Sequence, residues 1–458
     1  MVFRVVKRLV CAMLCLCLLL GAGYGCKKKY KEEIPVYTSD KEFYFGTWVG
    51  IGDSVKETDP ATGKTVTREL SDEEFDDQYR LLKEAGFNHT IVGNYQRAFP
   101  VADKYGINLY IAGSPINAML MDDIREEEDV LSDLQALYDE YSRHPSFAGV
   151  NIVDEPSFAA IKNYSNAKKR FEKVFKDKTF YINLFPAVAG PDRVSDSYEG
   201  YIKEYVDQIG TDYVSYDHYP LKYNPQNVNY IVPTFLYNME VLQAVAPEKQ
   251  HWTFLQSIQY TPANRTLTSV ADASFQAYSY LAFGGDGIQW FCYWTPGNNA
   301  VEQFGEACIG RDGKPTAIYD YVKTVNNEIH SFEHIYFSFD WKGVITTIGA
   351  ENQDGGENDS FSYLSTSLLS SHERIKSIKT QQDTLTGVFK DKDGRDGFMI
   401  VNYTEPSQKL DNKVEIEFND SSRAIVVKKG VQEVVDTVDG KLTFTMDEGE
   451  GYFVIPLK

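Results

Sequence analysis

Cysteine is scarce in this sequence, which has six cysteines in 458 residues. Three of them lie in an apolar N-terminal stretch, and the others are Cys26, Cys292 and Cys308. Two internal thiols do not make the disulfide framework of a small secreted domain, although an oxidising compartment would permit one Cys292–Cys308 bridge. The sequence contains no CxxC pair and no HExxH helix, and its seven histidines are scattered. We therefore expect no metal site and no cofactor.

Basic residues are also few in relation to acidic ones, with 46 Lys and Arg against 66 Asp and Glu. The formal net charge of −20 argues against a nucleic-acid partner, because a phosphate backbone needs a basic face. The apolar run Leu9–Leu20 is shorter than the roughly 20 residues that a membrane-spanning helix needs. The composition therefore indicates solubility rather than a particular mechanism.

The N-terminus has the layout of a secretory signal, in which basic residues precede the apolar run and small residues follow it up to Cys26. The sequence GAGYGC resembles the end of a bacterial lipoprotein signal. This resemblance implies that Cys26 becomes the lipidated first residue of the mature chain, and an ordinary secretory signal is the alternative. We expect a signal peptide over residues 1–26, a solvated tether over 27–42, and a lipid-anchored protein of the cell envelope, on the periplasmic or the surface face of the outer membrane.

From residue 43 to residue 334, short apolar runs alternate with longer segments of helical periodicity. Ser71 and Glu74 form a capping box before the first such helix, which Gly86 ends. The strand-like runs are EFYFGTWVG, FNHTIVGN, INLYIAG, FAGVNIVD, KTFYINLFP, DYVSYDHYP, HWTFLQSIQY and GIQWFCYW. Eight βα units in about 290 residues predict a (β/α)8 TIM barrel. A doubly wound open sheet is the alternative, but no GxGxxG turn follows the first run.

Residues 335–458 show another pattern, in which the helical signal fades and alternating apolar runs are separated by turn residues. The segment Asp391–Gly397 lies between two such runs and is typical of a hairpin turn. We therefore predict an α/β protein in which a C-terminal antiparallel β-sandwich domain follows the barrel.

Polar and aromatic side chains gather at the carboxyl ends of the predicted strands, where (β/α)8 barrels hold their active sites. Carboxylates and amides hydrogen-bond hydroxyl groups, and indole and phenol rings cover the apolar faces of sugars. No cluster of Arg or Lys occurs there, which disfavours anionic substrates and favours an oligosaccharide or polysaccharide. The candidate binding residues are Trp48, Asn94, Asp154, Asn183, Tyr219, Gln256, Trp290 and Trp294, and the candidate catalytic residues are Glu155 and Asp217.

Three motifs carry a resemblance to a known family. GVNIVDEPS ends the fourth strand, YDHYP ends the sixth, and YLAFGGDGIQWFCYWTP leads through the eighth. Together they resemble glycoside hydrolase clan A, and within it the β-galactosidases of family 42 and their relatives in Bacteroides-like bacteria. The resemblance covers most of residues 43–330. It implies that Glu155 is the general acid/base, that Asp154 stands at the sugar-binding Asn of the clan, and that Trp294 forms a platform.

The seventh strand departs from the pattern of the clan. Gln256 stands where the clan has a Glu nucleophile, and an amide cannot act as a carboxylate nucleophile. Asp217 on the neighbouring sixth strand is therefore the candidate second carboxylate. The resemblance further implies that Tyr219 is the aromatic hydroxyl near the nucleophile.

Two functions remain open from the sequence. One is a glycosidase with Glu155 as general acid/base, and the alternative is a non-catalytic glycan-binding surface lipoprotein of the same fold. A purely structural lipoprotein would not need aromatic and amide residues at so many strand ends. The competing structural interpretations are a helix cap near Pro156 for Glu155 and a solvated turn for Asp217.

Overall fold

The computed structural model describes residues 33–458 apart from 225, 227, 261–263 and 353–358. The predicted signal peptide, the lipidation site Cys26 and most of the predicted tether therefore lie outside the described residues. The segment Val36–Leu457 forms one compact unit. Among the described helices, none is long and apolar enough to cross a membrane.

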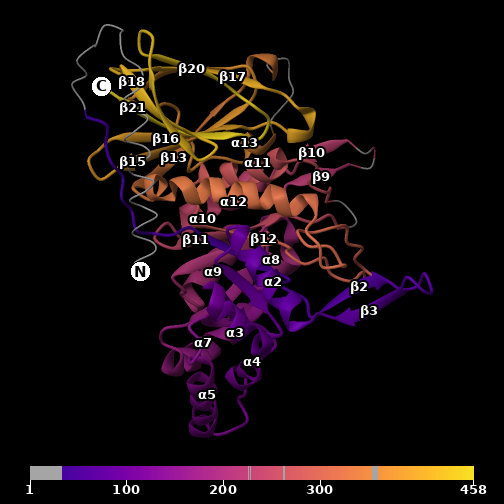
Figure 1. Ribbon diagram of the computed structural model, residues 1–458. Coiled ribbons are helices and arrows are strands. Elements are labelled where there is room, and N and C mark those ends of the chain that lie inside the picture. The colour runs from indigo at the N-terminus through magenta and orange to yellow at the C-terminus, as the bar shows by residue number, and fades with distance from the viewer. Residues whose placement is uncertain (1–32, 225, 227, 261–263, 353–358) are drawn as a thin grey trace. The chain divides into compact units, whose positions relative to one another are not determined.

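Eight parallel strands form a nearly closed barrel, in the order β1-β12-β11-β8-β7-β6-β5-β4. Figure 1 labels two of them, β11 and β12, among the helices of the barrel. Asn88 joins the first and last strands of this sheet, because its side chain accepts from the Phe45 amide and donates to the Phe43 carbonyl. The barrel prediction is therefore confirmed, and the open-sheet alternative is wrong. The strands are β1 (Tyr44–Trp48), β4 (His89–Val92), β5 (Asn108–Ile111), β6 (Phe147–Asp154), β7 (Thr179–Leu184), β8 (Tyr213–Asp217), β11 (Gln250–Gln256) and β12 (Gly287–Phe291).

Helices connect the strands and cover the outside of the barrel. The predicted capping box is confirmed at α2, where the Ser71 hydroxyl accepts from the Glu74 amide and the Glu74 carboxylate accepts from the Ser71 amide. The helices are α2 (Asp72–Glu84), α3 (Tyr95–Tyr105), α4 (Pro115–Leu120), α5 (Glu127–Tyr141), α6 (Phe158–Ile161), α7 (Asn163–Val174), α8 (Pro191–Val194), α9 (Tyr198–Gln208), α10 (Phe235–Val245), α11 (Val270–Leu281) and α12 (Ala317–Tyr336).

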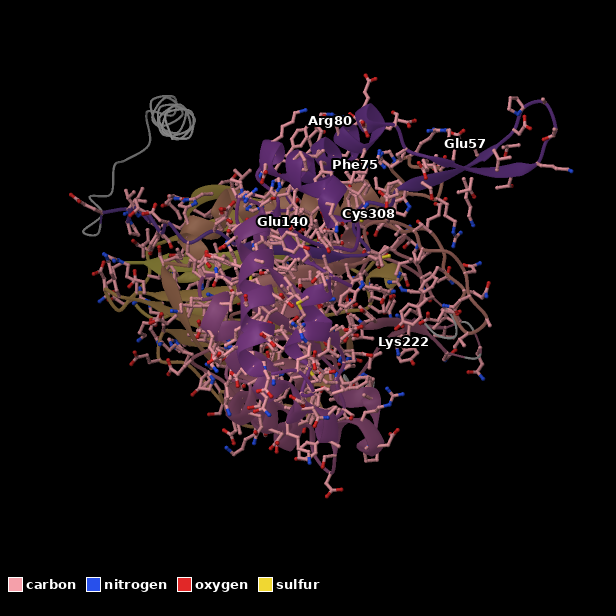
Figure 2. The ribbon with its side chains drawn as sticks, turned by 90° about the horizontal axis from the view of Figure 1, so that it is seen from below. Glu57, Phe75, Arg80, Glu140, Lys222 and Cys308 are labelled. Carbon is pink, nitrogen blue, oxygen red and sulfur yellow. The ribbon has the colours of Figure 1, made fainter. Side chains whose placement is uncertain are left out.

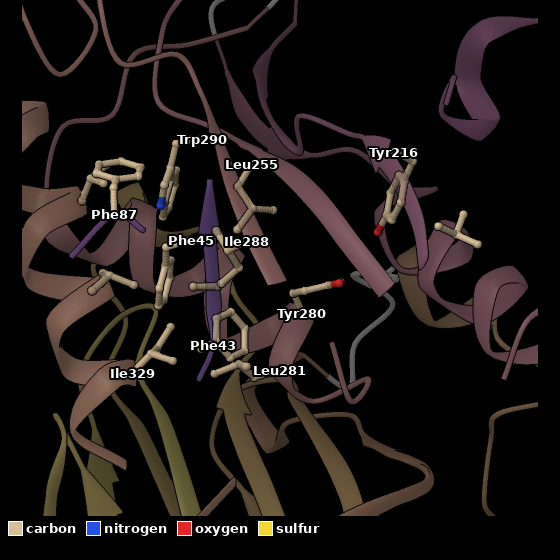
Figure 3. Packing of buried hydrophobic residues seen from close by; sticks show 14 of the residues in the cluster. Phe43, Phe45, Phe87, Tyr216, Leu255, Tyr280, Leu281, Ile288, Trp290 and Ile329 are labelled. Carbon is tan, nitrogen blue, oxygen red and sulfur yellow. The ribbon is translucent and has the colours of Figure 1, made fainter. Parts of the chain in front are cut away.

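The outward faces of the strands pack against these helices. In β12, Ile288 and Trp290 point outward, and Trp290 lies beside Phe87 and above Phe45 in Figure 3. The Trp290 indole donates a hydrogen bond to Asn326 on α12 at 2.9 Å. Because side chains alternate along a strand, Gly287, Gln289 and Phe291 then face the barrel interior.

Stacked aromatic rings fill the interior of the barrel below the carboxyl ends of its strands. The Trp252 ring lies parallel to Tyr44, with ring centres 4.2 Å apart, and to Tyr213, at 4.1 Å. Tyr110 and Tyr181 extend the layer at 5.0 Å. This layer leaves the carboxyl end as the open end of the barrel, where a ligand can enter.

Two antiparallel sheets follow α12 and pack together as the predicted β-sandwich, with Phe398 and Ile400 facing Val414 and Ile416 in one core. The predicted hairpin at residue 391 is confirmed by the pairing of β15 with β16. One sheet holds β13 (Phe339–Thr347), β15 (Thr384–Asp391), β16 (Asp396–Asn402), β18 (Arg423–Lys428), β19 (Val431–Asp436) and β21 (Gly451–Leu457), and the other holds β14 (Ile375–Thr380), β17 (Asn412–Phe418) and β20 (Lys441–Met446).

A buried ion pair network joins the barrel to the sandwich. Arg265, in the loop between β11 and α11, is 5% exposed and donates to Asp272 on α11 and to Glu405 of the sandwich, each at 3.0 Å. Removing one partner of such a network leaves buried charge uncompensated, so these contacts hold the loop after β11 in place.

The short helix α13 (Asp359–Ser362) lies between β13 and β14 in the chain.

Two hairpins extend from loops at the carboxyl end of the barrel. The hairpin of β2 (Ser54–Thr58) and β3 (Thr65–Glu69) projects from the loop after β1, and Glu57 marks it in Figure 2. The second, formed by β9 (Leu221–Tyr223) and β10 (Asn229–Ile231), follows β8. Long βα loops are the usual place for residues that form an active site in this fold.

Candidate active site

A cavity of about 200 Å³ opens where the predicted strand ends converge. Six barrel strands and the loops after β6, β8, β11 and β12 supply its walls, so residues far apart in the sequence meet at one point. Its lining is acidic, amide-bearing and aromatic, and contains no basic side chain among the described residues. The lining residues are Trp48, Asp154, Glu155, Asn183, Asp217, Tyr219, Phe254, Tyr260, Phe291 and Glu302.

Asn183 holds two of the carboxylates in place. Its side-chain amide donates to Asp154 at 3.2 Å and to Asp217 at 3.1 Å, and its carbonyl oxygen accepts from the Ser215 hydroxyl at 3.0 Å. Ser215 in turn accepts from Gln289 in the barrel interior at 2.9 Å. This chain of hydrogen bonds fixes the orientation of the Asn183 amide, because its oxygen accepts from the Ser215 hydroxyl and its nitrogen must then face the carboxylates.

Glu155 follows the last residue of β6, in an unusual backbone conformation. Its φ is +47°, a left-handed value that is uncommon for a residue other than glycine and is found where a site constrains the chain. Its amide still pairs with the Asn183 carbonyl at 2.8 Å. The next helix, α6, has Ser157 as its N-cap residue, so the alternative interpretation of Glu155 as a helix cap is wrong.

The electrostatics of the site favour a protonated Glu155. Burial raises the pKa of Glu155, and the nearby charges of Asp217 and Asp154 raise it further. Burial and the Asp154 charge also raise the pKa of Asp217, but hydrogen bonds from Glu155, Asn183 and Tyr219 oppose that rise. The pKa of Glu155 is therefore raised further than that of Asp217, so Glu155 holds its proton more firmly. Asp217 is buried, so the turn interpretation of this residue does not hold.

Aromatic rings form the remaining walls of the cavity. Tyr219 lies against Phe291, with ring centres 5.6 Å apart, and meets Tyr260 edge-on at 5.9 Å. Trp48 packs edge-on against Phe254 at 5.9 Å. Such a wall covers the apolar face of a sugar ring, while the carboxylates and Asn183 reach its hydroxyl groups.

Four predicted site residues lie outside this cavity. The Asn94 side chain donates to Asp53 at 2.7 Å and belongs to the start of α3. Trp290 lies in the outer core, as described above, and Trp294 is 6% exposed and packs beneath Gly52. The predicted indole platform is therefore replaced by Phe291, because the inward-facing positions of β12 are 287, 289 and 291.

Gln256 is the fourth of these residues, and it lies outside the cavity although it ends β11. The side chain is 1% exposed, accepts from the Leu221 amide at 3.3 Å, and donates to the Arg265 carbonyl. Its role is to join the loops after β8 and β11. The strand β11 thus ends in a buried amide that does not line the cavity.

Sequence reasoning missed Phe254, Tyr260, Phe291 and Glu302. The alternation of side chains along β11 and β12 could have found Phe254 and Phe291. Tyr260 and Glu302 lie in loops, where no periodic signal places a side chain.

Cys292 and Cys308 are both buried and free, so the permitted disulfide is not formed. Within the described residues, no group of His, Cys, Asp or Glu is arranged to hold a metal ion.

The fold is similar to that of solved glycoside hydrolases. No protein-family model matches the sequence, and no curated protein matches it significantly. A family 42 β-galactosidase from G. stearothermophilus, solved as a catalytic mutant, aligns with a TM-score of 0.54 at 9% identity, over 92% of this chain and 99% of that one. A family 5 glycoside hydrolase from Bacteroides vulgatus ATCC 8482 aligns with a TM-score of 0.50 at 14% identity, over 91% and 89% of the chains.

A further glycoside hydrolase aligns with a TM-score of 0.50 at 12% identity, over 92% of this chain and 96% of that one. At identities this low, the similarity concerns the fold alone. The predicted resemblance to clan A is confirmed at that level, since the chain has the (β/α)8 barrel of these enzymes. The chemistry must be argued from the site.

Proposed function

We propose that this protein is a glycoside hydrolase that cleaves an oligosaccharide or polysaccharide, with Glu155 as general acid/base. The observation that carries the proposal is an aromatic-walled cavity at the carboxyl end of a (β/α)8 barrel that holds three carboxyl groups side by side, of which Glu155 has a pKa raised by burial and by its acidic neighbours. A neutral acid that keeps its proton near neutral pH can protonate the oxygen of a leaving sugar. The glycoside hydrolases of similar fold support the same reaction class.

Asp217 and Asp154 position the acid and bind substrate in this proposal. The charge of Asp217 raises the pKa of Glu155, which favours the protonated form of Glu155 in the resting site. Asp154 and Asn183 lie beside the acid, and their oxygen and nitrogen atoms suit the hydroxyl groups of the sugar. Tyr219, Phe291 and Trp48 supply the apolar contact.

A non-catalytic glycan receptor is the second candidate function. The observation that favours it is Gln256, which leaves β11 without the carboxylate that clan A enzymes use as nucleophile. Both candidates bind glycans through the same cavity, and only the first releases sugar. Purified protein incubated with plant and host polysaccharides separates them, with released reducing sugar as the measurement. Release supports the hydrolase, whereas binding without release supports the receptor.

We also propose that the protein is anchored to the cell envelope by a lipid on Cys26. The support is the N-terminal sequence, with its basic start, apolar run and GAGYGC ending. Labelled palmitate fed to expressing bacteria tests this. The wild-type chain incorporates the label and sediments with membranes, whereas Cys26→Ser does neither. Unlabelled wild-type protein in the soluble fraction would contradict the anchor.

A further inference from the structure

A chain of hydrogen bonds runs from the interior of the barrel to the carboxylates of the cavity. It begins at two phenols, because the Tyr181 hydroxyl donates to Oε1 of Gln289 at 2.6 Å and the Tyr44 hydroxyl donates to the same atom at 3.1 Å. The Gln289 amide donates to the Ser215 hydroxyl at 2.9 Å, and that hydroxyl donates to Oδ1 of Asn183 at 3.0 Å. We call Tyr44, Tyr181, Gln289 and Ser215 the interior relay.

The carboxylates of the cavity fix the direction of this chain. An ionised carboxylate only accepts, so the Asn183 nitrogen donates to Asp154 at 3.2 Å and to Asp217 at 3.1 Å. The Asn183 oxygen therefore faces Ser215 and uses the single proton of that hydroxyl, so Ser215 can only accept from Gln289. The reverse direction would turn the Asn183 oxygen toward two carboxylates, where it would find no donor.

The phenols at the other end of the relay are suited to donate. Burial raises the pKa of Tyr44 and of Tyr181 well above the usual value, so both keep their protons. The Tyr181 hydroxyl also lies 3.0 Å from the Ser215 hydroxyl, which places Ser215 at the centre of the relay. Tyr181, Gln289 and Ser215 are fully buried, so the loss of one member would leave its partners without a hydrogen bond in a place shielded from water.

The relay reaches the proposed acid through Asn183 and Asp217. Burial raises the pKa of Asp217, and the hydrogen bond from Asn183 opposes this rise and favours the charged form. The charge of Asp217 adds to burial in raising the pKa of Glu155. Ser215 is not among the described residues that line the cavity, so it can affect the acid only through Asn183.

We propose that Ser215 is a positioning residue of the reaction, an inference that rests on the proposed glycosidase function. Its hydroxyl accepts a hydrogen bond from Gln289 and donates one to the oxygen of Asn183, which turns the Asn183 nitrogen toward the carboxylates. The barrel interior thereby orients the Asn183 amide before a substrate binds, and this orientation costs no rearrangement during the reaction.

Solvent exchange of the Asn183 side-chain amide protons tests the relay without a substrate. The protein is labelled with nitrogen-15 asparagine, and Asn183→Ala identifies the resonance. Ser215→Ala removes the donor to the Asn183 oxygen, so we expect these protons to exchange about tenfold faster or more than in wild type. Ser215→Cys keeps a weaker donor and should give an intermediate rate.

Ser279→Ala is the matched control for both measurements. Ser279 lies on α11 and is as fully buried as Ser215, but its hydroxyl has no hydrogen-bond partner among the described residues. The same substitution there should leave the exchange of the Asn183 amide unchanged, and kcat should stay within about twofold of wild type.

Kinetics test whether the relay serves the reaction. On a glycan that the wild type cleaves, Ser215→Ala should lower kcat about tenfold, whereas KM should stay within about threefold because the substrate does not touch Ser215. In an Asn183→Ala background, the same substitution should change kcat by less than about twofold, because its effect passes through Asn183. Circular dichroism and thermal unfolding check that each variant is folded.

The possible outcomes separate this inference from the proposed function. Equal exchange of the Asn183 amide in Ser215→Ala and wild type would overturn the relay. A loss of kcat that is as large in the Asn183→Ala background as in wild type would overturn the positioning role, and both results would leave the glycosidase intact. A wild-type protein that cleaves no glycan would overturn the proposed function and the role of Ser215 in it, whereas the exchange measurement would still decide the relay.

Discussion

Glu155 and Asp217 line the same cavity, and burial together with the charge of Asp217 raises the pKa of Glu155. Asn183 donates to Asp217 at 3.1 Å, which favours the charged form of that residue. The negative charge of Asp217 in turn disfavours ionisation of Glu155. Glu155 is thereby prepared as an acid, and Asp217 stays charged in the same cavity. Other sites likewise separate the pKa values of two carboxyl groups through their environment.

The first prediction concerns the pH dependence of hydrolysis. Above the raised pKa of Glu155 the acid loses its proton, and kcat/KM should fall. Asp217→Asn removes a charge that raises this pKa, so the alkaline limb should move to lower pH by about one unit or more. The measurement is kcat/KM against pH. Glu128→Gln, an exposed change on α5, should leave the limb in place. An alkaline limb that is the same in Asp217→Asn and wild type would contradict this role.

The second prediction concerns stability. The folded-state pKa of Glu155 lies above its unfolded value of about 4.3, so its stabilising contribution is full below that value and is lost as pH rises toward the folded pKa. Glu155→Gln has no proton to lose. Urea unfolding should show equal stability of variant and wild type near pH 4. Near pH 8, the variant should be more stable by about 1 kcal/mol or more. A stability difference between variant and wild type that does not change with pH would contradict the raised pKa of Glu155.

The third prediction separates Phe291 from Trp294. Phe291 lines the cavity, whereas Trp294 packs beneath Gly52. In a Glu155→Gln background, calorimetry should show that Phe291→Ala weakens glycan binding about tenfold, from the loss of one ring contact. Trp294→Phe should keep the affinity and lower the free energy of unfolding by about 1 to 3 kcal/mol. Weaker binding by Trp294→Phe alone would restore the indole platform that the sequence predicted.

The fourth prediction concerns Gln256. Gln256→Glu introduces the carboxylate of the clan, but at a side chain that is 1% exposed and donates to the Arg265 carbonyl. We expect no gain in kcat and a loss of about 2 kcal/mol or more in the free energy of unfolding, because the variant buries an acid beside a carbonyl oxygen. Steady-state kinetics and urea unfolding measure both. A higher kcat would mean that β11 can still hold a nucleophile and would contradict this expectation.

The barrel and much of its rim were predictable from the sequence. Eight alternating βα units fix the fold, and parallel strands bring their carboxyl ends together. Asp154, Glu155, Asn183, Asp217 and Tyr219 were therefore expected in one place, and the structure brings them into one cavity together with Trp48. Asp154, Asn183 and Asp217 end their strands, Glu155 directly follows β6, and Tyr219 lies two residues after β8.

The remaining site could not be predicted, for two physical reasons. In GIQWFCYW, the end of the strand is ambiguous by a few residues, and a shift of one residue turns every side chain to the other face. That shift is why Trp290 lies in the outer core while Phe291 lines the cavity. Glu302 depends on a loop that Asn299 and Arg311 fold back over the barrel, and such long-range contacts leave no local pattern.

The central claim is that Glu155 is the acid of a glycosidase, and one paired measurement tests it most directly. Wild-type protein and Glu155→Gln are compared on a broad panel of polysaccharides, with released reducing sugar and calorimetric binding recorded for each. We predict that the wild type cleaves at least one glycan. Glu155→Gln should bind that glycan with similar affinity, but its rate of cleavage should be lower by about 100-fold or more. Cleavage by Glu155→Gln at the wild-type rate, or no cleavage of any glycan by the wild type, would contradict the claim.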